Sequence, residues 1–202
     1  MALEKRRLKI STIEDLNDPF EFGLHTIRDR SQRRMWREVI NYTFERNGLI
    51  SFSDNWNSPL MWSHYADSHK GLALGFDVKI GDYLKKVIYV SERELLPKVT
   101  DFNKDQMVSK IDKATYTKFD HWQYEQEYRT FVNLDEKDGE TNLYFLDFGP
   151  ETVLKEIVLG PKCVLTSRDL RKKTSGSVKF TTARLAFQTF EVVPQKNRKL
   201  QK

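Results

Sequence analysis

The pattern of this sequence changes from helical to extended within one stretch, Trp122-Gln123-Tyr124-Glu125-Gln126-Glu127-Tyr128-Arg129-Thr130-Phe131-Val132-Asn133-Leu134. Before it, apolar residues recur at steps of three and four from about Asp101 to Trp122, which predicts a long helix. From there on we expect three or four short strands, at Glu127–Leu134, Leu143–Asp147, Ile157–Leu159 and Phe187–Val193. Strands dominate this half, and its one further helix, capped at Thr166 or Ser167, is inserted among them. We therefore predict an α+β fold with a mostly antiparallel twisted sheet rather than a doubly wound α/β fold.

The first half adds a second long helix and several strands. Apolar residues at helical spacing between about Arg28 and Arg46 predict that helix, with arginines on its other face. A shorter helix is expected from Pro59 to about Asp67, because Ser58 is a good N-cap and Pro59 suits the first helical position. The expected strands are Arg7–Ser11, Leu49–Ser53, Leu72–Phe76 and Lys86–Val90.

Length and composition limit the class of protein. A chain of 202 residues fits one domain, and we predict a single α+β domain over residues 1–195 followed by a basic tail, 196–202. The single cysteine, Cys163, and the lack of a signal peptide predict a reducing, cytoplasmic compartment. No apolar stretch reaches the roughly 18 residues of a membrane span. The four histidines lack paired Cys/His spacing, so no metal site is expected.

The positive charge is concentrated near the C-terminus. Residues 161–202 hold 11 basic and 2 acidic side chains, although the net charge of the whole chain is only +5. A basic segment of this kind can bind nucleic acid or another polyanion. The alternative is that the last seven residues, Lys196–Lys202, are simply a solvated end.

The densest group of chemically active side chains lies in the stretch quoted first. If Tyr124–Val132 is extended, Glu125, Glu127 and Arg129 share one face, and the two carboxylates lie about 7 Å apart. Such a pair can grip one sugar or cation, while Arg129 holds one carboxylate ionised. Three aromatic residues flank the run and favour a walled cleft, namely Trp122, Tyr124 and Tyr128. The alternative is an exposed ladder of salt bridges.

Two other groups are candidates for binding. His64 and Tyr65 lie on the predicted short helix. There His64 packs in the core, stacks on a base or nicotinamide, or acts as a neutral hydrogen-bond donor. Ser51 and Ser53 point their hydroxyls to the same side of a strand, which is also ordinary in half-buried strands. The turn Leu16–Glu21 is expected to be a chain reversal held by Asx hydrogen bonds. The chain has no P-loop, Rossmann, nucleophile-elbow or zincin motif.

Together, these motifs resemble a large bacterial family of domains of unknown function that is often found near prophage and phage-defence genes. The resemblance covers roughly Leu8 to Gly160. It rests on three motifs in order, with the Ser51–Ser53 strand between the first and second: Leu16-Asn17-Asp18-Pro19-Phe20-Glu21, Met61-Trp62-Ser63-His64-Tyr65-Ala66 and Trp122 through Arg129. The family implies no settled activity.

A weaker likeness is to the ADP-ribosyltransferase fold, in which a hydroxyl-bearing strand precedes a Glu-x-Glu motif. That likeness implies that Glu127 binds the ribose next to nicotinamide and stabilises the cationic centre as nicotinamide leaves. It implies that Glu125 orients the acceptor and that His64 and Tyr65 help to form the pocket wall. Ser51, Ser53, Trp122 and Arg129 complete the residues expected to bind NAD, which would be a substrate, since no firm cofactor is expected.

The start of the chain departs from both patterns. Relatives open with an additional strand that carries a His- or Lys-aromatic motif, and in transferases the first strand supplies a dinucleotide anchor. Its absence here implies a shortened gene product, a degenerate enzyme or a role filled by another residue. Two hypotheses follow: an NAD-using transferase or glycohydrolase with a protein or nucleic-acid acceptor, and a non-catalytic module that binds a nucleotide, nucleic acid or phage protein.

Overall fold

The computed structural model describes residues 3–79, 84–98, 101–174 and 177–202, and it has the α+β fold predicted from the sequence. The chain divides into two compact units, each built from segments far apart in the sequence. Unit 1 comprises Met1–Leu8, Ser53–Gly81 and Leu146–Lys202. Unit 2 comprises Lys9–Phe52 and Asp82–Phe145. The single domain over residues 1–195 stays a prediction.

Unit 1 is organised around a four-stranded sheet in the order β13-β12-β11-β4. These strands are β4 (Leu72–Val78), β11 (Thr152–Leu159), β12 (Lys179–Leu185) and β13 (Val192–Pro194). β11 pairs antiparallel with β4 and parallel with β12, and β12 pairs antiparallel with β13. The sheet is therefore mostly antiparallel, as expected.

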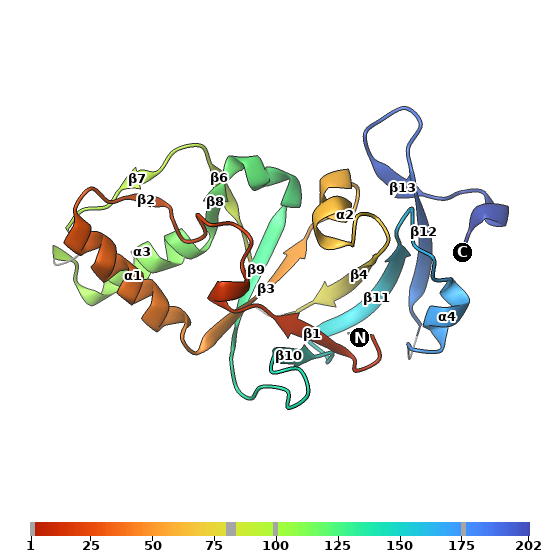
Figure 1. The fold of residues 1–202 in the computed structure, drawn as a ribbon, viewed down its shortest axis with the longest axis horizontal. Helices are drawn as coiled ribbons and strands as arrows, with labels where there is room; N and C mark the ends of the chain where they lie inside the picture. The colour runs from red at the N-terminus through yellow and green to blue at the C-terminus, as the bar shows by residue number, and fades with distance from the viewer. Residues whose placement is uncertain (1–2, 80–83, 99–100, 175–176) are drawn as a thin grey trace. The chain divides into compact units, whose positions relative to one another are not determined.

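The central strand β11 buries both of its faces. Ile157 and Leu159 pack on one side with Leu170 of α4 (Ser167–Arg171), whose cap is Thr166, one of the two expected caps. Val158 points to the other side, where it packs with Trp62 of α2 (Pro59–Tyr65). Because side chains alternate along a strand, the two helices cover opposite faces of this sheet (Figure 1).

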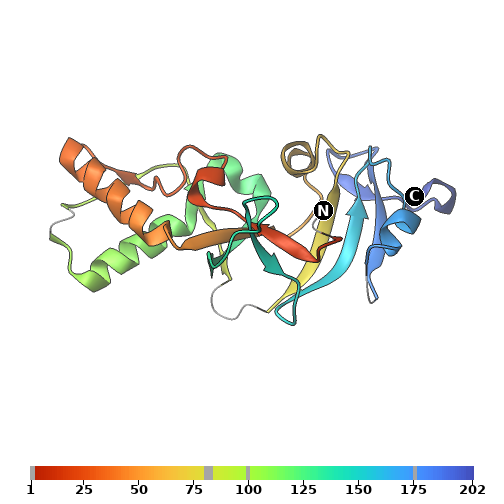
Figure 2. The same ribbon diagram turned by 60° about the horizontal axis from the view of Figure 1, so that its bottom comes forward.

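Unit 2 contains the two long helices, α1 (Arg30–Phe44) and α3 (Lys104–Thr115), which contribute to the same apolar core. Figures 1 and 2 show α1 in orange and α3 in green. Each helix begins at a residue whose side chain accepts a backbone N–H, Asp29 for α1 and Asn103 for α3. Within the part of the chain that the structure describes, no helix combines the length and apolar character needed to cross a membrane.

Small sheets complete unit 2. Strand β9 (Glu127–Asn133) lies between β3 (Asn47–Ser53) and β5 (Lys85–Lys86). Two parallel pairs are β6 (Ile88–Val90) with β8 (Thr117–Phe119) and β2 (His25–Thr26) with β7 (Glu94–Leu95). The pair of β1 (Arg7–Ile10) with β10 (Tyr144–Asp147) belongs to neither unit alone, because the division between the units falls within both strands. Among the described residues, the 3-10 helices η1 (Ile13–Asp15) and η4 (Asp120–Glu125) lie in unit 2, and η5 (Arg198–Leu200) lies in unit 1.

Several predicted elements differ from the structure. The single strand expected at Lys86–Val90 is two strands, β5 and β6, which belong to different sheets. The helix expected over residues 101–122 ends at Thr115, because the β-branched and aromatic residues that follow favour the extended strand β8, which pairs with β6. The strand expected at Phe187–Val193 is instead a hairpin tip followed by the short strand β13. The chain reverses there, between the antiparallel strands β12 and β13. Strand β12 itself was not expected.

Candidate functional site

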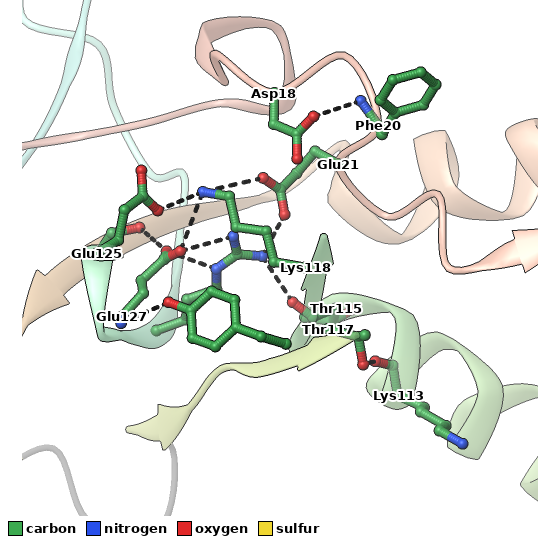
Figure 3. A network of polar contacts seen from close by, with 12 residues as sticks. Asp18, Phe20, Glu21, Lys113, Thr115, Thr117, Lys118, Glu125 and Glu127 are labelled. Atoms are coloured by element: carbon green, nitrogen blue, oxygen red, sulfur yellow. Dashed lines mark hydrogen bonds and ion pairs between the residues drawn. The ribbon is translucent and has the colours of Figure 1, made fainter. Parts of the chain in front are cut away.

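Glu125 and Glu127 are brought to the same place by different elements. Glu127 is the first residue of β9, whereas Glu125 is the last residue of η4. Between them Gln126 has a left-handed backbone, with φ of 45°. The prediction that Tyr124–Val132 is one extended strand is therefore wrong at its start, since the chain turns there before β9 begins. Despite that turn, both carboxylates contact the ammonium group of Lys118 (Figure 3).

Arg129 is the cation at the centre of the site and is only 1% exposed. Its Nε donates to Glu127 Oε1 at 2.6 Å and its Nη2 to Glu127 Oε2 at 2.9 Å, which is a two-bond contact with one carboxylate. Its Nη1 donates to Glu21 Oε1 at 2.5 Å and to the Thr115 carbonyl at 2.9 Å. Glu127 and Arg129 thus share one side of β9, as predicted.

Lys118 of β8 is the second cation, and it lies among three carboxylates (Figure 3). Its Nζ is 2.6 Å from Glu125 Oε2, 3.4 Å from Glu127 Oε2 and 3.8 Å from Glu21 Oε2. It also lies 4.8 Å from the centroid of the Trp122 ring. We call Glu21, Lys118, Glu125, Glu127 and Arg129 the buried charge network. With every group ionised, this network has three negative and two positive charges.

The network meets solvent at Ser51 on β3. Ser51 is exposed, and its Oγ donates to Glu127 Oε1 at 2.6 Å. On another side, the backbone N–H of Glu127 donates to the Tyr89 hydroxyl oxygen at 2.9 Å. The five charged side chains have exposed fractions of only 1–6%. The alternative of an exposed salt-bridge ladder is therefore wrong.

The carboxyl pKa values diverge within the network. Burial raises the pKa of Glu21 and outweighs the attraction of Arg129 and Lys118. Burial acts in the same direction on Glu127, but its hydrogen bonds and charge contact with Arg129, helped by Lys118 and Ser51, lower its pKa overall. Burial opposes the charge of Lys118, yet the nearby carboxylates raise its pKa. Glu127 is thus held ionised, whereas Glu21 takes up a proton more readily than a solvated glutamate.

The turn that carries Glu21 adds another carboxyl group. Asp18 is 4% exposed, and its Oδ1 accepts the Phe20 N–H at 2.9 Å, which is the Asx hydrogen bond expected in this turn. The Glu21 N–H donates to the Asp18 carbonyl at 3.0 Å. Among the described residues, Asp18 Oδ2 has no hydrogen-bond partner. A buried acceptor without a partner is rare, and it is suited to a hydroxyl or amine from a ligand.

The structure brings together Ser51, Glu125, Glu127 and Arg129. Trp122 lies next to this group, because its ring contacts the ammonium group of Lys118. The other three predicted residues belong to unit 1. There, Ser53 Oγ donates to the Asn55 carbonyl at 2.9 Å. His64 and Tyr65 lie on α2, are both exposed, and have ring centroids 6.2 Å apart. His64 is therefore not a core histidine.

The sequence did not identify Lys118 or Glu21 as site residues. Glu21 was attributed to a chain reversal, and Lys118 fell inside the predicted helix. Lys118 stands between Thr117 and Phe119 in a strongly β-forming run. A lysine in such a run, shortly before two glutamates, was the available signal for a buried counter-ion.

Comparison with protein-family models gives a match over part of the chain. Residues 61–130 match the model of a family described as a protein of unknown function, DUF2971. The match includes the Met61–Ala66 motif and the Trp122–Arg129 motif, so similarity to a domain of unknown function is found over this part of the chain. No curated protein and no solved structure matches the chain.

Proposed function

We propose that unit 2 carries a glycosyl-transfer site that uses NAD as its substrate, with Glu127 and Glu125 as its paired carboxylates. The observation that carries this proposal is the 2.6 Å hydrogen bond from Ser51 Oγ to Glu127 Oε1. It joins the hydroxyl-bearing strand to the Glu-x-Glu motif across 76 positions of sequence. These are the two elements whose proximity an ADP-ribosyltransferase-like site requires.

The charges of the site suit this reaction. In NAD, the bond between the nicotinamide nitrogen and the ribose C1′ breaks, and its electron pair leaves with nicotinamide. The ribose becomes cationic, and an ionised carboxylate stabilises that cation. Glu127 fits this role because Arg129 and Lys118 keep its pKa low. A water or acceptor hydroxyl then forms the new bond to C1′ and gives its proton to Glu125.

Lys118 is the partner of Glu127 that a substrate hydroxyl can replace. The carboxylate of Glu127 accepts two bonds from Arg129 and one from Ser51, all at 2.9 Å or less, whereas Lys118 is 3.4 Å away. A ribose hydroxyl can replace Lys118 at the lowest cost, because Lys118 keeps its 2.6 Å contact with Glu125. The approach is on the side of Ser51, which is exposed.

Aromatic rings near the network suit the planar parts of NAD. Trp122 and Tyr124 lie on η4, with ring centroids 5.9 Å apart, and both are partly exposed. Flat rings of this kind stack on nicotinamide or adenine. Asp18 Oδ2, which has no hydrogen-bond partner among the described residues, is a further acceptor within the same unit.

Nicotinamide release from NAD tests this proposal. The wild-type protein is compared with Glu127→Gln and with a matched control, Glu156→Gln. Glu156 also accepts a hydroxyl and a lysine, at Thr181 and Lys179, but it lies in unit 1. Release is expected from the wild type and from Glu156→Gln and should fall at least about 100-fold in Glu127→Gln.

Unfolding of the variant is separated from loss of chemistry by two checks. Urea unfolding establishes that each variant is folded at the assay temperature, and Glu125→Gln provides a second change in the same pair. Slower release from folded Glu125→Gln supports the proposal. An inactive wild type, or equal release from wild type and folded Glu127→Gln, rejects it.

A further inference from the structure

The connection between β12 and β13 in unit 1 is a closed hairpin tip (Figure 1). The Ala186 N–H donates to the Glu191 carbonyl at 2.9 Å and closes the loop. Thr189 Oγ1 donates to the Glu191 carboxylate at 2.8 Å, which fixes the far side of the loop. We call residues 186–191 the aromatic hairpin tip. Its backbone is held by its own hydrogen bonds.

The tip presents two phenylalanine rings to solvent. Phe187 is 92% exposed and Phe190 is 99% exposed, although phenylalanine is usually among the more buried residue types. Neither ring contributes to the apolar clusters of unit 1. Grouped apolar side chains left in water on a fixed loop indicate a surface that binds something.

The charge around the tip indicates the kind of partner. The Arg184 guanidinium carbon lies 4.8 Å from the centroid of the Phe187 ring, so a cation and an aromatic ring form one platform. Between Lys179 and Lys202 there are six basic residues and one acidic residue, Glu191. A partner that fits combines negative charge with flat, weakly solvated rings.

We propose that the aromatic hairpin tip binds single-stranded nucleic acid, with unpaired bases stacking on Phe187 and Phe190 and phosphate contacting Arg184. Bases of a single strand can stack on aromatic and guanidinium planes, and basic side chains neutralise the backbone. In a duplex those base faces are already covered, so a duplex binds less well.

The polar side chains of the tip argue against insertion into a membrane. Gln188, Thr189 and Glu191 are all exposed beside the two rings. Burial of the tip in lipid would remove these groups from water, and Glu191 would be repelled by anionic headgroups. Stacking by a single strand covers the rings and leaves these groups solvated. This inference goes beyond the proposed glycosyl transfer and does not depend on it.

Binding of a fluorescently labelled oligothymidine of about 20 nucleotides to the full chain tests the proposal. The Phe187→Ala/Phe190→Ala double variant should bind at least about tenfold more weakly than the wild type. The matched control is Phe20→Ala, because Phe20 is also exposed and has the Arg93 guanidinium carbon 4.8 Å from its ring centroid, but it lies in unit 2. That control should bind like the wild type.

Salt and strand state provide the remaining measurements. Wild-type affinity should fall steeply as salt is added, and Arg184→Gln should make that fall less steep. The same sequence as a duplex should bind more weakly. The proposal is overturned by no binding at low salt, by equal affinity of the double variant or by equal affinity for the duplex. Binding to anionic vesicles that needs both rings, without binding to the oligonucleotide, also overturns it.

Discussion

The buried charge network of unit 2 and the aromatic hairpin tip of unit 1 both depart from the usual distribution of side chains, in which charged groups are exposed and phenylalanine rings are buried. The network buries five charged groups, whereas the hairpin tip leaves two phenylalanine rings almost wholly in water. Buried charges are costly unless each has a partner, so they constrain the fold around them. Exposed rings have little influence on the fold, so their significance lies in what they bind. The two regions should therefore respond differently to mutation.

The largest effect on stability is expected at Arg129. Replacement by methionine leaves Glu21 and Glu127 buried without their main cation and should lower the free energy of unfolding by about 3–5 kcal/mol. The control is Lys179→Met in unit 1, which removes an exposed lysine from its pair with the half-buried Glu156 and should cost about 0–1 kcal/mol. Urea unfolding measures both. Similar losses of stability in Arg129→Met and Lys179→Met would contradict the prediction.

A pH-dependent effect is expected at His25, which is buried in unit 2 without the partners that the network provides. Within the described residues, neither of its ring nitrogens has a hydrogen-bond partner, and burial lowers its pKa from 6.5 to about 4. Between these values the unfolded chain binds the proton more tightly, so the fold loses stability as pH falls from 6.5 to about 4.

Replacement of this histidine tests that dependence. His25→Phe keeps a ring against Trp36 and should reduce the loss of stability on acidification. His64→Phe, at an exposed position in unit 1, should leave the loss as it is in the wild type. The measurement is urea unfolding across this pH range. Parallel pH profiles for His25→Phe and wild type would contradict the prediction.

A smaller effect is expected at Ser51, where the network meets solvent. Ser51→Ala removes the hydrogen bond to Glu127 and should cost about 1 kcal/mol, because water can take the place of the hydroxyl. It should also raise the pKa of Glu127, since Ser51 helps to lower it. Ser51→Thr retains a hydroxyl and should restore both properties. Urea unfolding measures the stability, and NMR titration measures the pKa of Glu127. An unchanged stability or an unchanged pKa in Ser51→Ala would contradict the prediction.

The smallest effect on stability is expected at the hairpin tip. Phe190→Ala should change the free energy of unfolding by less than about 0.5 kcal/mol, because the ring is exposed. Phe44→Ala in the core of unit 2 should cost about 3–5 kcal/mol, since that ring is buried and stacked on Phe22. A large loss in Phe190→Ala would mean that the tip has a structural role instead of a binding role.

The sequence predicted most where local patterns decide structure. Both long helices, the cap at Thr166 and the strand beginning at Glu127 follow from spacing and capping residues. The contact between Ser51 and Glu127 was expected only through the likeness to a known fold. Local patterns alone carry no information on which strands become neighbours.

The sequence predicted least where pairing between distant segments decides structure. Lys118 lay inside the predicted helix, but pairing of β8 with β6 made it part of a strand, and its ammonium group contacts Glu125. Glu21 reaches Arg129 across 108 positions, which no local pattern indicates. At Phe187 and Phe190 a strand was predicted, whereas the hydrogen bond from the Ala186 N–H to the Glu191 carbonyl closes a hairpin tip.

The most direct test of the proposed chemistry is the rate of nicotinamide release by Glu127→Gln relative to Glu156→Gln, both confirmed as folded. Each change removes one carboxylate that accepts a hydroxyl and a lysine, but only Glu127 belongs to the buried charge network. The account predicts release by Glu156→Gln at the wild-type rate and at least about 100-fold slower release by Glu127→Gln. Equal rates, or no release from the wild type, would contradict it.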